Sequence, residues 1–228
     1  MAFEILNQNI PRIRGVLFDM DGLVLDTEKL YCRFWIEAAQ HFGFSMTREQ
    51  SLSMRALTHA AAQKNLWGYF GPTADHKQIR SKRIELMDAY IAENGVDLKP
   101  GIGELLDYLH ANGILCAITS SSPLERIRAH LAFHGLDTRF DALCSGHDVP
   151  NGKPAPDIYL HGAASLRLPP ENCLALEDAP AGIEAAYRAG CHPVIIPDLD
   201  HPSEETLSRC FGKADSLADI IDLLKNLC

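Results

Sequence analysis

The stretch GVLFDMDGLVLDTEKLY, residues 15–31, begins with an apolar run and then changes to acidic residues and glycine. The run Val16–Phe18 is typical of a buried parallel strand, because helices cover both faces of such a strand. Asp19 and Asp21 follow at the point where the strand ends, and Gly22 permits the backbone to turn sharply. The segment therefore predicts a strand that leads into a loop carrying two carboxylates.

Four more short apolar runs, each bounded by turn residues, lie farther along the chain. They are residues 114–118, 142–144, 173–176 and 194–196. Helical periodicity occupies the gaps, over residues 122–134, 156–166 and 181–189. Gly135 and Gly190 stand where two of these helices are expected to end. Because strands alternate with helices, we predict an α/β fold with a doubly wound parallel sheet and a Rossmann-like core.

The gap between the first two predicted strands is far longer than the roughly dozen residues that a crossover needs. Residues 28–96 show helical spacing of apolar side chains, as at Leu30, Phe34 and Ala38, and no convincing strand. We therefore predict that residues 28–96 form a small α-helical cap domain. Residues 1–27 and 97–228 are then expected to form the α/β catalytic core.

Composition narrows the class of partner. Apolar residues make up 46% of the 228 residues, as in an ordinary globular core, and the formal charge is −9. An acidic surface disfavours nucleic acid as a partner, although a local site can still bind a small phosphorylated molecule. No apolar run approaches the roughly 20 residues that span a bilayer. We expect a protein without a membrane partner, either a monomer or a weak homodimer.

The cysteines and the N-terminus bear on the compartment. Seven cysteines are scattered along the chain without a CxxC pair, and the first 15 residues lack a basic start followed by an apolar stretch. This pattern indicates neither a disulfide framework nor a signal peptide. We therefore expect a cytoplasmic protein. His130 and His134 lie four residues apart on one predicted helix, and we interpret them as surface residues and not as metal ligands.

Functional side chains follow four of the predicted strands, at the edge of the sheet where open α/β folds bind ligands. Any one of them has an ordinary structural explanation, such as a turn or a helix cap. Together they are unlikely to reach one edge by accident. They are Asp19 and Asp21 after the first strand, Thr119 and Ser120 after the second, Lys153 after the third, and Glu177 and Asp178 after the fourth.

The same segments resemble the motifs of the haloacid dehalogenase-like hydrolase superfamily. GVLFDMDGLVLDTEKLY resembles its first motif, and LEDAPAGIEAAYRAG, residues 176–190, resembles its last. The resemblance covers almost the whole chain, and it is weakest in the cap. It implies the branch with a helical cap between the first two core strands, which includes phosphatases and β-phosphoglucomutase-like enzymes.

The residue types agree with phosphoryl transfer, which needs a nucleophile, charge neutralisation and help for the leaving group. Asp19 is the candidate nucleophile, which would form an aspartyl-phosphate, and Asp21 is the candidate general acid and base. Lys153 supplies a positive charge. Thr119 and the backbone N–H of Ser120 are candidates to hold phosphoryl oxygens.

A hard cation completes the predicted site. The carboxylates of Asp19, Asp178 and Glu177 form an all-oxygen set that suits Mg²⁺ better than zinc. The resemblance implies that the Asp21 backbone carbonyl is a further ligand and that Glu177 binds directly or through water. It also implies that Arg55 lies in a cap loop facing the core, where it could hold a second anionic group of the substrate.

The combined prediction is a magnesium-dependent phosphatase that hydrolyses a small phosphorylated metabolite, a sugar phosphate or a nucleotide-like monoester. The first alternative is a phosphosugar mutase of the β-phosphoglucomutase type. That family carries a histidine at the position of Tyr31, and the departure disfavours the mutase. A non-catalytic regulator that binds a phosphorylated ligand is a second alternative, which the presence of both Asp19 and Asp21 disfavours.

Overall fold

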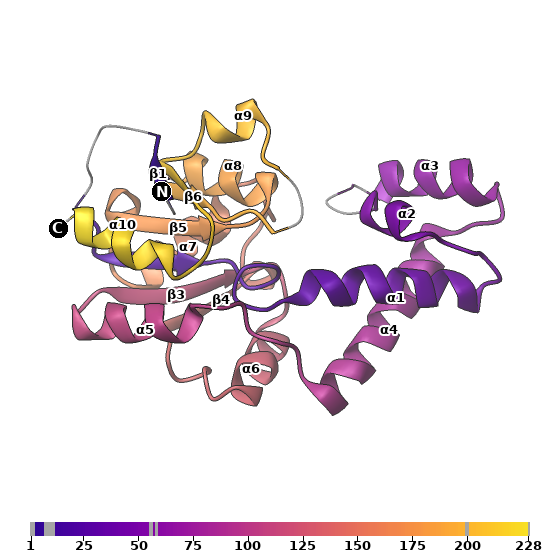
Figure 1. The fold of residues 1–228 in the computed structure, drawn as a ribbon, viewed down its shortest axis with the longest axis horizontal. Helices are drawn as coiled ribbons and strands as arrows, with labels where there is room; N and C mark the ends of the chain where they lie inside the picture. Colours follow the sequence, from indigo (N-terminus) through magenta and orange to yellow (C-terminus); the bar gives the residue numbers. More distant parts are fainter. Residues whose placement is uncertain (1–2, 7–11, 55–56, 58, 199–200, 228) are drawn as a thin grey trace. The chain divides into compact units, whose positions relative to one another are not determined.

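The computed structural model describes residues 3–6, 12–54, 57, 59–198 and 201–227. The chain forms two compact units (Figure 1). The first, called the core unit, consists of Met1–Leu25 and Asp97–Cys228, and the second, called the helical unit, consists of Asp26–Val96.

The core unit is built on one sheet. Its strands, in the part of the chain that is described, lie in the order β1-β7-β6-β5-β2-β3-β4. Their bounds are β1 Phe3–Ile5, β2 Gly15–Phe18, β3 Leu115–Ser120, β4 Ala142–Ser145, β5 Cys173–Glu177, β6 His192–Ile195 and β7 Gly212–Ala214. All neighbours except β1 and β7 pair in parallel. This order confirms the predicted doubly wound α/β fold, and the five predicted strands are all present.

Two short neighbouring strands, β1 and β7, depart from the prediction. Strand β1 pairs with β7 in the antiparallel direction, so the sheet is mostly but not wholly parallel. Neither strand was expected from the sequence. Each has only three residues, and β1 is half-buried to exposed along its length. Apolar runs signal strands that are buried on both faces. The exposed edge strand β1 and the three-residue β7, Gly-Lys-Ala, lack that signal.

Helices cover both faces of the sheet. Their bounds are α5 Ile102–Ala111, α6 Leu124–Phe133, α7 Asp157–Ser165, α8 Pro180–Arg188, α9 Glu204–Leu207 and α10 Asp219–Leu227, with short 3₁₀ turns at Gly146–Asp148 and Pro170–Asn172. Helices α7 and α8 pack together on one face, over a core that includes Leu17, Ala117 and Ala175. The predicted helices are confirmed, and Gly135 and Gly190, just beyond α6 and α8, adopt positive φ.

The centre of the sheet brings several strand ends together. Strand β2 lies between β3 and β5, and Phe18 is in register with both Ile118 and Leu176. Strands β3 and β4 lie on one side of β2, and β5, β6 and β7 lie on the other, so this is the point where the strand order reverses. The residues that follow Phe18, Ile118 and Leu176 therefore lie side by side at the carboxyl edge.

The helical unit contains α1 Thr27–His41, α2 Arg48–Leu52, α3 His59–Phe70 and α4 His76–Asn94. Its core includes Trp35, Leu66 and Ile79. A hydrogen bond of 2.5 Å joins Nδ1 of His59 to Nδ1 of the buried His76, and the Trp35 ring stacks on His76. Burial, aided by the neighbouring His59, lowers the pKa of His76 below its usual value.

One sequence interpretation is wrong. His130 is buried, with 6% of its surface exposed, and is not a surface residue. It lies on the inner side of α6 beside Ile127 and Leu131, where the helix faces the sheet. All six described cysteines are free thiols, and five of them are buried. Within the described ranges, no helix combines the length and the apolar character that a membrane crossing requires.

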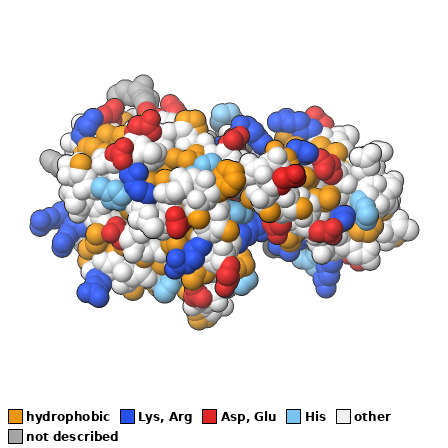
Figure 2. Space-filling model, turned by 90° about the horizontal axis from the view of Figure 1, so that it is seen from below, with side chains coloured by type: hydrophobic (Ala, Val, Ile, Leu, Met, Phe, Trp, Pro, Cys, Tyr) orange, Lys and Arg blue, Asp and Glu red, His pale blue; other side chains and the backbone are white. Residues whose placement is uncertain are grey.

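The surface has no strong bias of charge on the side that Figure 2 shows. Acidic and basic side chains are interspersed there, with hydrophobic side chains scattered among them (Figure 2).

Candidate active site

Asp19 directly follows β2, and its backbone extends the pairing with β5 by one hydrogen bond. Its N–H donates to the Leu176 carbonyl at 3.0 Å, which holds the residue against β5. The residue is buried, with 8% of its surface exposed. Beyond it the chain turns through Gly22, whose φ of 88° lies in the left-handed region that favours glycine. This turn keeps Asp21 on a loop beside the strand end, where it is half-buried.

Lys153 bridges two carboxylates at this edge. Its Nζ donates to Oδ1 of Asp19 at 2.5 Å and to Oε1 of Glu177 at 2.6 Å. Burial alone would lower the pKa of Lys153, but the charges of Asp19 and Glu177 outweigh it and raise the pKa well above its usual value. The ammonium therefore stays charged, and one of its three N–H donors is left for another acceptor.

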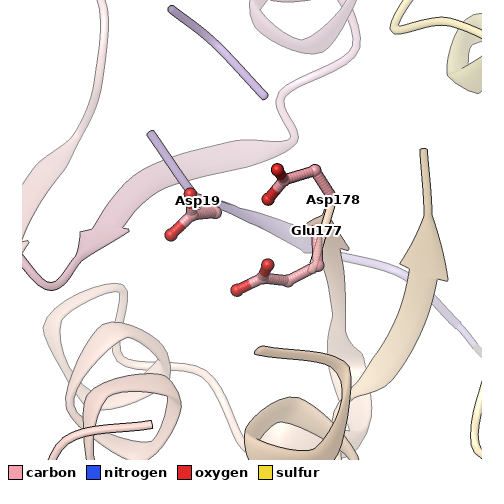
Figure 3. Close-up of side chains that lie close together, drawn as sticks. All are labelled: Asp19, Glu177 and Asp178. Carbon is pink, nitrogen blue, oxygen red and sulfur yellow. The ribbon is translucent and has the colours of Figure 1, made fainter. Parts of the chain in front are cut away.

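Three carboxylates converge on a small space. Asp19 comes from the end of β2, while Glu177 and Asp178 come from the end of β5, and their side chains extend toward Asp19 (Figure 3). Each offers one oxygen, and these three atoms lie within 4.8 Å of one another. Burial raises the pKa of Asp19 to about 7; Lys153 opposes this, and the charge of Glu177 adds to it.

The cluster has the properties of a site for a hard cation. Among the described residues, Lys153 pairs with two of the three carboxylates, Asp19 and Glu177, so acidic groups gather at the place where they converge. All three donors are oxygens, as Mg²⁺ prefers. The residues present therefore fit a divalent magnesium ion.

Glu177 is held by several contacts. It is 1% exposed, and its Oε1 accepts hydrogen bonds from Lys153 and, at 2.5 Å, from the hydroxyl of Tyr159. Its Oε2 accepts a longer bond of 3.4 Å from the N–H of Ala179. A Cβ atom on Gly182 would lie 1.8 Å from Oε1, so the start of α8 packs directly on this carboxylate.

Hydroxyl groups at the end of β3 and in the loop after it lie at the same edge. Thr119 is fully buried, and its Oγ1 donates to the Phe18 carbonyl at 3.1 Å. Ser120 accepts at Oγ from the N–H of Ser122 at 3.1 Å, and Ser122 Oγ donates to Oδ2 of Asp21 at 3.3 Å. The loop that follows β3 therefore contacts the second aspartate of the first motif.

The structure brings six of the predicted site residues together directly: Asp19, Lys153, Glu177 and Asp178 in one cluster, with Thr119 and Ser120 on the neighbouring strand. Asp21 lies two residues beyond Asp19 in the adjoining loop. Arg55 lies outside the described residues. The roles assigned to all of these residues remain predictions.

Three residues at the site were not expected from the sequence. They are Ser122, Tyr159 and Gly182. Tyr159 lies in an apolar helical pattern and was interpreted only as part of a helix. Gly182 did carry a signal, because a glycine inside a helix commonly marks a close approach of another group. The contact of Ser122 with Asp21 depends on how the loops after β2 and β3 meet.

Comparisons with known proteins show what this chain is similar to. The model of a family described as haloacid dehalogenase-like hydrolase matches residues 16–196. A "Probable pseudouridine-5'-phosphatase" from Drosophila melanogaster is 33% identical over 222 residues, which cover 93% of this chain and 94% of that protein. Hexitol phosphatase B from Escherichia coli is 29% identical over 212 residues, covering 92% and 96%.

A solved structure is similar over the same span. It is CbbY from Rhodobacter sphaeroides in complex with phosphate, with a TM-score of 0.73 and 27% sequence identity. The match covers 91% of this chain and 96% of that one.

Proposed function

Because the chain belongs to the haloacid dehalogenase-like hydrolase family, we propose that it is a magnesium-dependent phosphatase of a small phosphorylated metabolite. The observation that carries the proposal is the arrangement around Asp19. Its carboxylate is bonded to Lys153 and lies within the acidic cluster, while Asp21 follows two residues later on a half-buried loop.

The first step is transfer of the phosphoryl group to Asp19. An oxygen of the Asp19 carboxylate attacks phosphorus, and the bond from phosphorus to the ester oxygen breaks, with its electron pair leaving on that oxygen. Asp21 donates a proton to this departing oxygen, so an alcohol is released. The product on the protein is an aspartyl-phosphate.

The second step is hydrolysis of that intermediate. Water attacks phosphorus, Asp21 takes the proton of this water, and the bond to the Asp19 oxygen breaks. Inorganic phosphate leaves, and Asp19 returns as a carboxylate. Asp21 thus exchanges the roles of acid and base between the two steps. Its hydrogen bond from Ser122 holds the carboxyl group near the strand end where both steps occur.

Charge at the site is balanced by groups of both signs. Lys153 neutralises part of the negative charge of Asp19 and offers an N–H to a phosphoryl oxygen. Asp19, Asp178 and Glu177, with the backbone carbonyl of Asp21, would hold Mg²⁺. When bound, the cation supplies positive charge that lets an anionic nucleophile approach an anionic phosphate. Thr119 and the N–H of Ser120 are proposed to contact phosphoryl oxygens.

The proposed substrate class comes from the relatives. The two curated relatives carry the names of phosphatases that act on a nucleotide-like monoester and on hexitol phosphates. A sugar phosphate or a nucleotide-like monoester is therefore proposed for this chain. We assign the helical unit the role of a cap that selects the substrate, with Arg55 as a candidate contact.

A phosphate-release assay tests the proposal. Phosphorylated sugars, hexitols and nucleosides are incubated with the chain, with Mg²⁺ or with EDTA, and free phosphate is measured. We expect release from at least one monoester, dependent on Mg²⁺ and abolished by Asp19→Asn, because an amide cannot attack phosphorus. Release at near wild-type rate by purified Asp19→Asn would contradict the mechanism.

The mutase is the competing proposal, because Asp19 and Asp21 would begin either reaction. Tyr31 distinguishes them. It lies in α1 with the guanidinium of Arg83 4.5 Å from its ring centre, and a phenol cannot carry out the proton transfers of a histidine near pH 7. β-Glucose 1-phosphate with a trace of the 1,6-bisphosphate is therefore expected to yield free phosphate. Rapid glucose 6-phosphate with little free phosphate would favour the mutase instead.

A further inference from the structure

Tyr159 is a buried side chain whose polar atom points into the candidate site. It lies in α7, is fully buried, and donates its hydroxyl to Oε1 of Glu177 at 2.5 Å. A buried phenol hydroxyl needs a partner, but here the partner is a carboxylate that also holds Lys153. The hydroxyl therefore belongs to the hydrogen-bond network of the site and is not merely satisfied within the core.

The surroundings of Glu177 leave this carboxylate little freedom. Lys153 and Tyr159 both donate to Oε1, and the start of α8 closes off the other side at Gly182. At 1% exposure, Glu177 has almost no contact with solvent that could replace a lost donor. Without the phenol hydroxyl, Oε1 would keep Lys153 as its one donor among these contacts, and the carboxylate could turn about its side chain.

The position of Lys153 depends on Glu177 in turn. Its ammonium donates to Glu177 and to Asp19, which places the charge between the two acids. A displaced Glu177 would draw the ammonium away from Asp19 or leave it held by one acid alone. These two hydrogen bonds fix the orientation of the ammonium. The direction of its third N–H toward a phosphoryl oxygen therefore changes when they change.

We propose that Tyr159 is a positioning residue that acts through Glu177, holding this carboxylate where it anchors Lys153 beside Asp19. The inference rests on the proposed function, since it assigns Lys153 to the phosphoryl group. In this proposal Glu177 mainly anchors Lys153, and Asp19 and Asp178 contribute more to cation binding than Glu177 does.

Tyr159→Phe isolates the hydroxyl. The variant keeps the ring, which packs in the core and lies 5.2 Å from the Lys153 ammonium, and it removes only the donor. Tyr187→Phe is the matched control, because Tyr187 is a tyrosine of the adjacent helix α8 that is 55% exposed. Thermal melts in EDTA establish that each variant is folded.

The measurements separate an effect on phosphate binding through Lys153 from an effect on Mg²⁺ binding. Calorimetric titration with Mg²⁺ alone, and then with inorganic phosphate in the presence of Mg²⁺, is performed for wild type and both variants, together with kcat and KM. For Tyr159→Phe we expect a fall of about tenfold in kcat, equivalent to about 1.4 kcal/mol. Phosphate binding should weaken several-fold, and Mg²⁺ affinity should change less than twofold. Tyr187→Phe should behave as wild type.

A second background tests the route of the effect. In Glu177→Ala the partner of the hydroxyl is gone, so adding Tyr159→Phe should lower phosphate affinity no further. If both backgrounds lose affinity equally, Tyr159 does not act through Glu177 and the proposal fails. It also fails if Tyr159→Phe binds phosphate as wild type does, or loses only Mg²⁺ affinity. Phosphate titration does not require turnover, so an inactive wild type would refute the proposed function without removing this test.

Discussion

Replacing Gly182 with alanine is expected to destabilise the chain, although the same replacement stabilises most helices. Alanine exceeds glycine in helix propensity by up to about 1 kcal/mol. Gly182 lies near the start of α8, and a Cβ atom there would be 1.8 Å from Oε1 and 1.9 Å from Cδ of Glu177. Because no real contact is that short, either the carboxylate or the helix must move.

The cost follows from what the carboxylate would leave behind. Moving it breaks the hydrogen bonds from Lys153 and Tyr159, and a bond to a charged group contributes about 1.5–3 kcal/mol. Partial relaxation of α8 recovers some of this, and helix propensity returns up to about 1 kcal/mol. A net loss of about 2–4 kcal/mol remains. For a chain of this length that corresponds to a fall in Tm of about 5–15 °C.

Thermal melts followed by circular dichroism measure this effect, with Gly103→Ala as the control. Gly103 also lies near the start of a core helix, α5, but a Cβ atom there would meet nothing within 4 Å. Its Tm should be unchanged or slightly raised. Phosphatase activity of Gly182→Ala should fall together with its Tm. A Tm for Gly182→Ala equal to that of wild type or higher would refute the packing argument.

Three more outcomes are expected. Asp21→Asn should lower kcat by about 10²–10⁴-fold while leaving phosphate binding within a few-fold of wild type. Kinetics and calorimetry measure these two effects, and weakened phosphate binding with an unchanged kcat would contradict the role of Asp21. EDTA should abolish phosphate release and Mg²⁺ should restore it; full activity after dialysis against chelator would contradict the magnesium dependence. Burial, and then the neighbouring His59, disfavour the charged form of His76 and lower its pKa. As the pH falls toward and below the usual value of 6.5, the unfolded chain therefore binds a proton at this histidine more readily than the folded chain does. Stability should therefore decrease between pH 7.5 and 5.5, and His76→Gln should show a shallower decrease in Tm over that range.

Most of the core fold was predictable because its signals are local. A strand buried on both faces appears as a continuous apolar run, and a helix on such a sheet shows its own periodicity. These patterns predicted β2 to β6 and the helices between them. Strands β1 and β7 carry no such signal, because each has only three residues and the edge strand β1 is half-buried to exposed along its length. The interpretation of His130 as a surface residue was wrong, because the residue type of a histidine does not tell which side of α6 faces the sheet.

The sequence by itself determined which chemical groups reach the carboxyl edge, since the end of a strand and the loop after it are consecutive positions in the chain. Asp19, Lys153, Glu177 and Asp178 follow from that rule together with the strand order expected of an α/β sheet. Only the tertiary structure decided how they are held. Tyr159 reaches Glu177 from α7, and Gly182 closes on the same carboxylate from α8, because both helices pack on one face of the sheet. Such contacts depend on the direction in which each helix crosses the sheet, and no local pattern of residues records that direction.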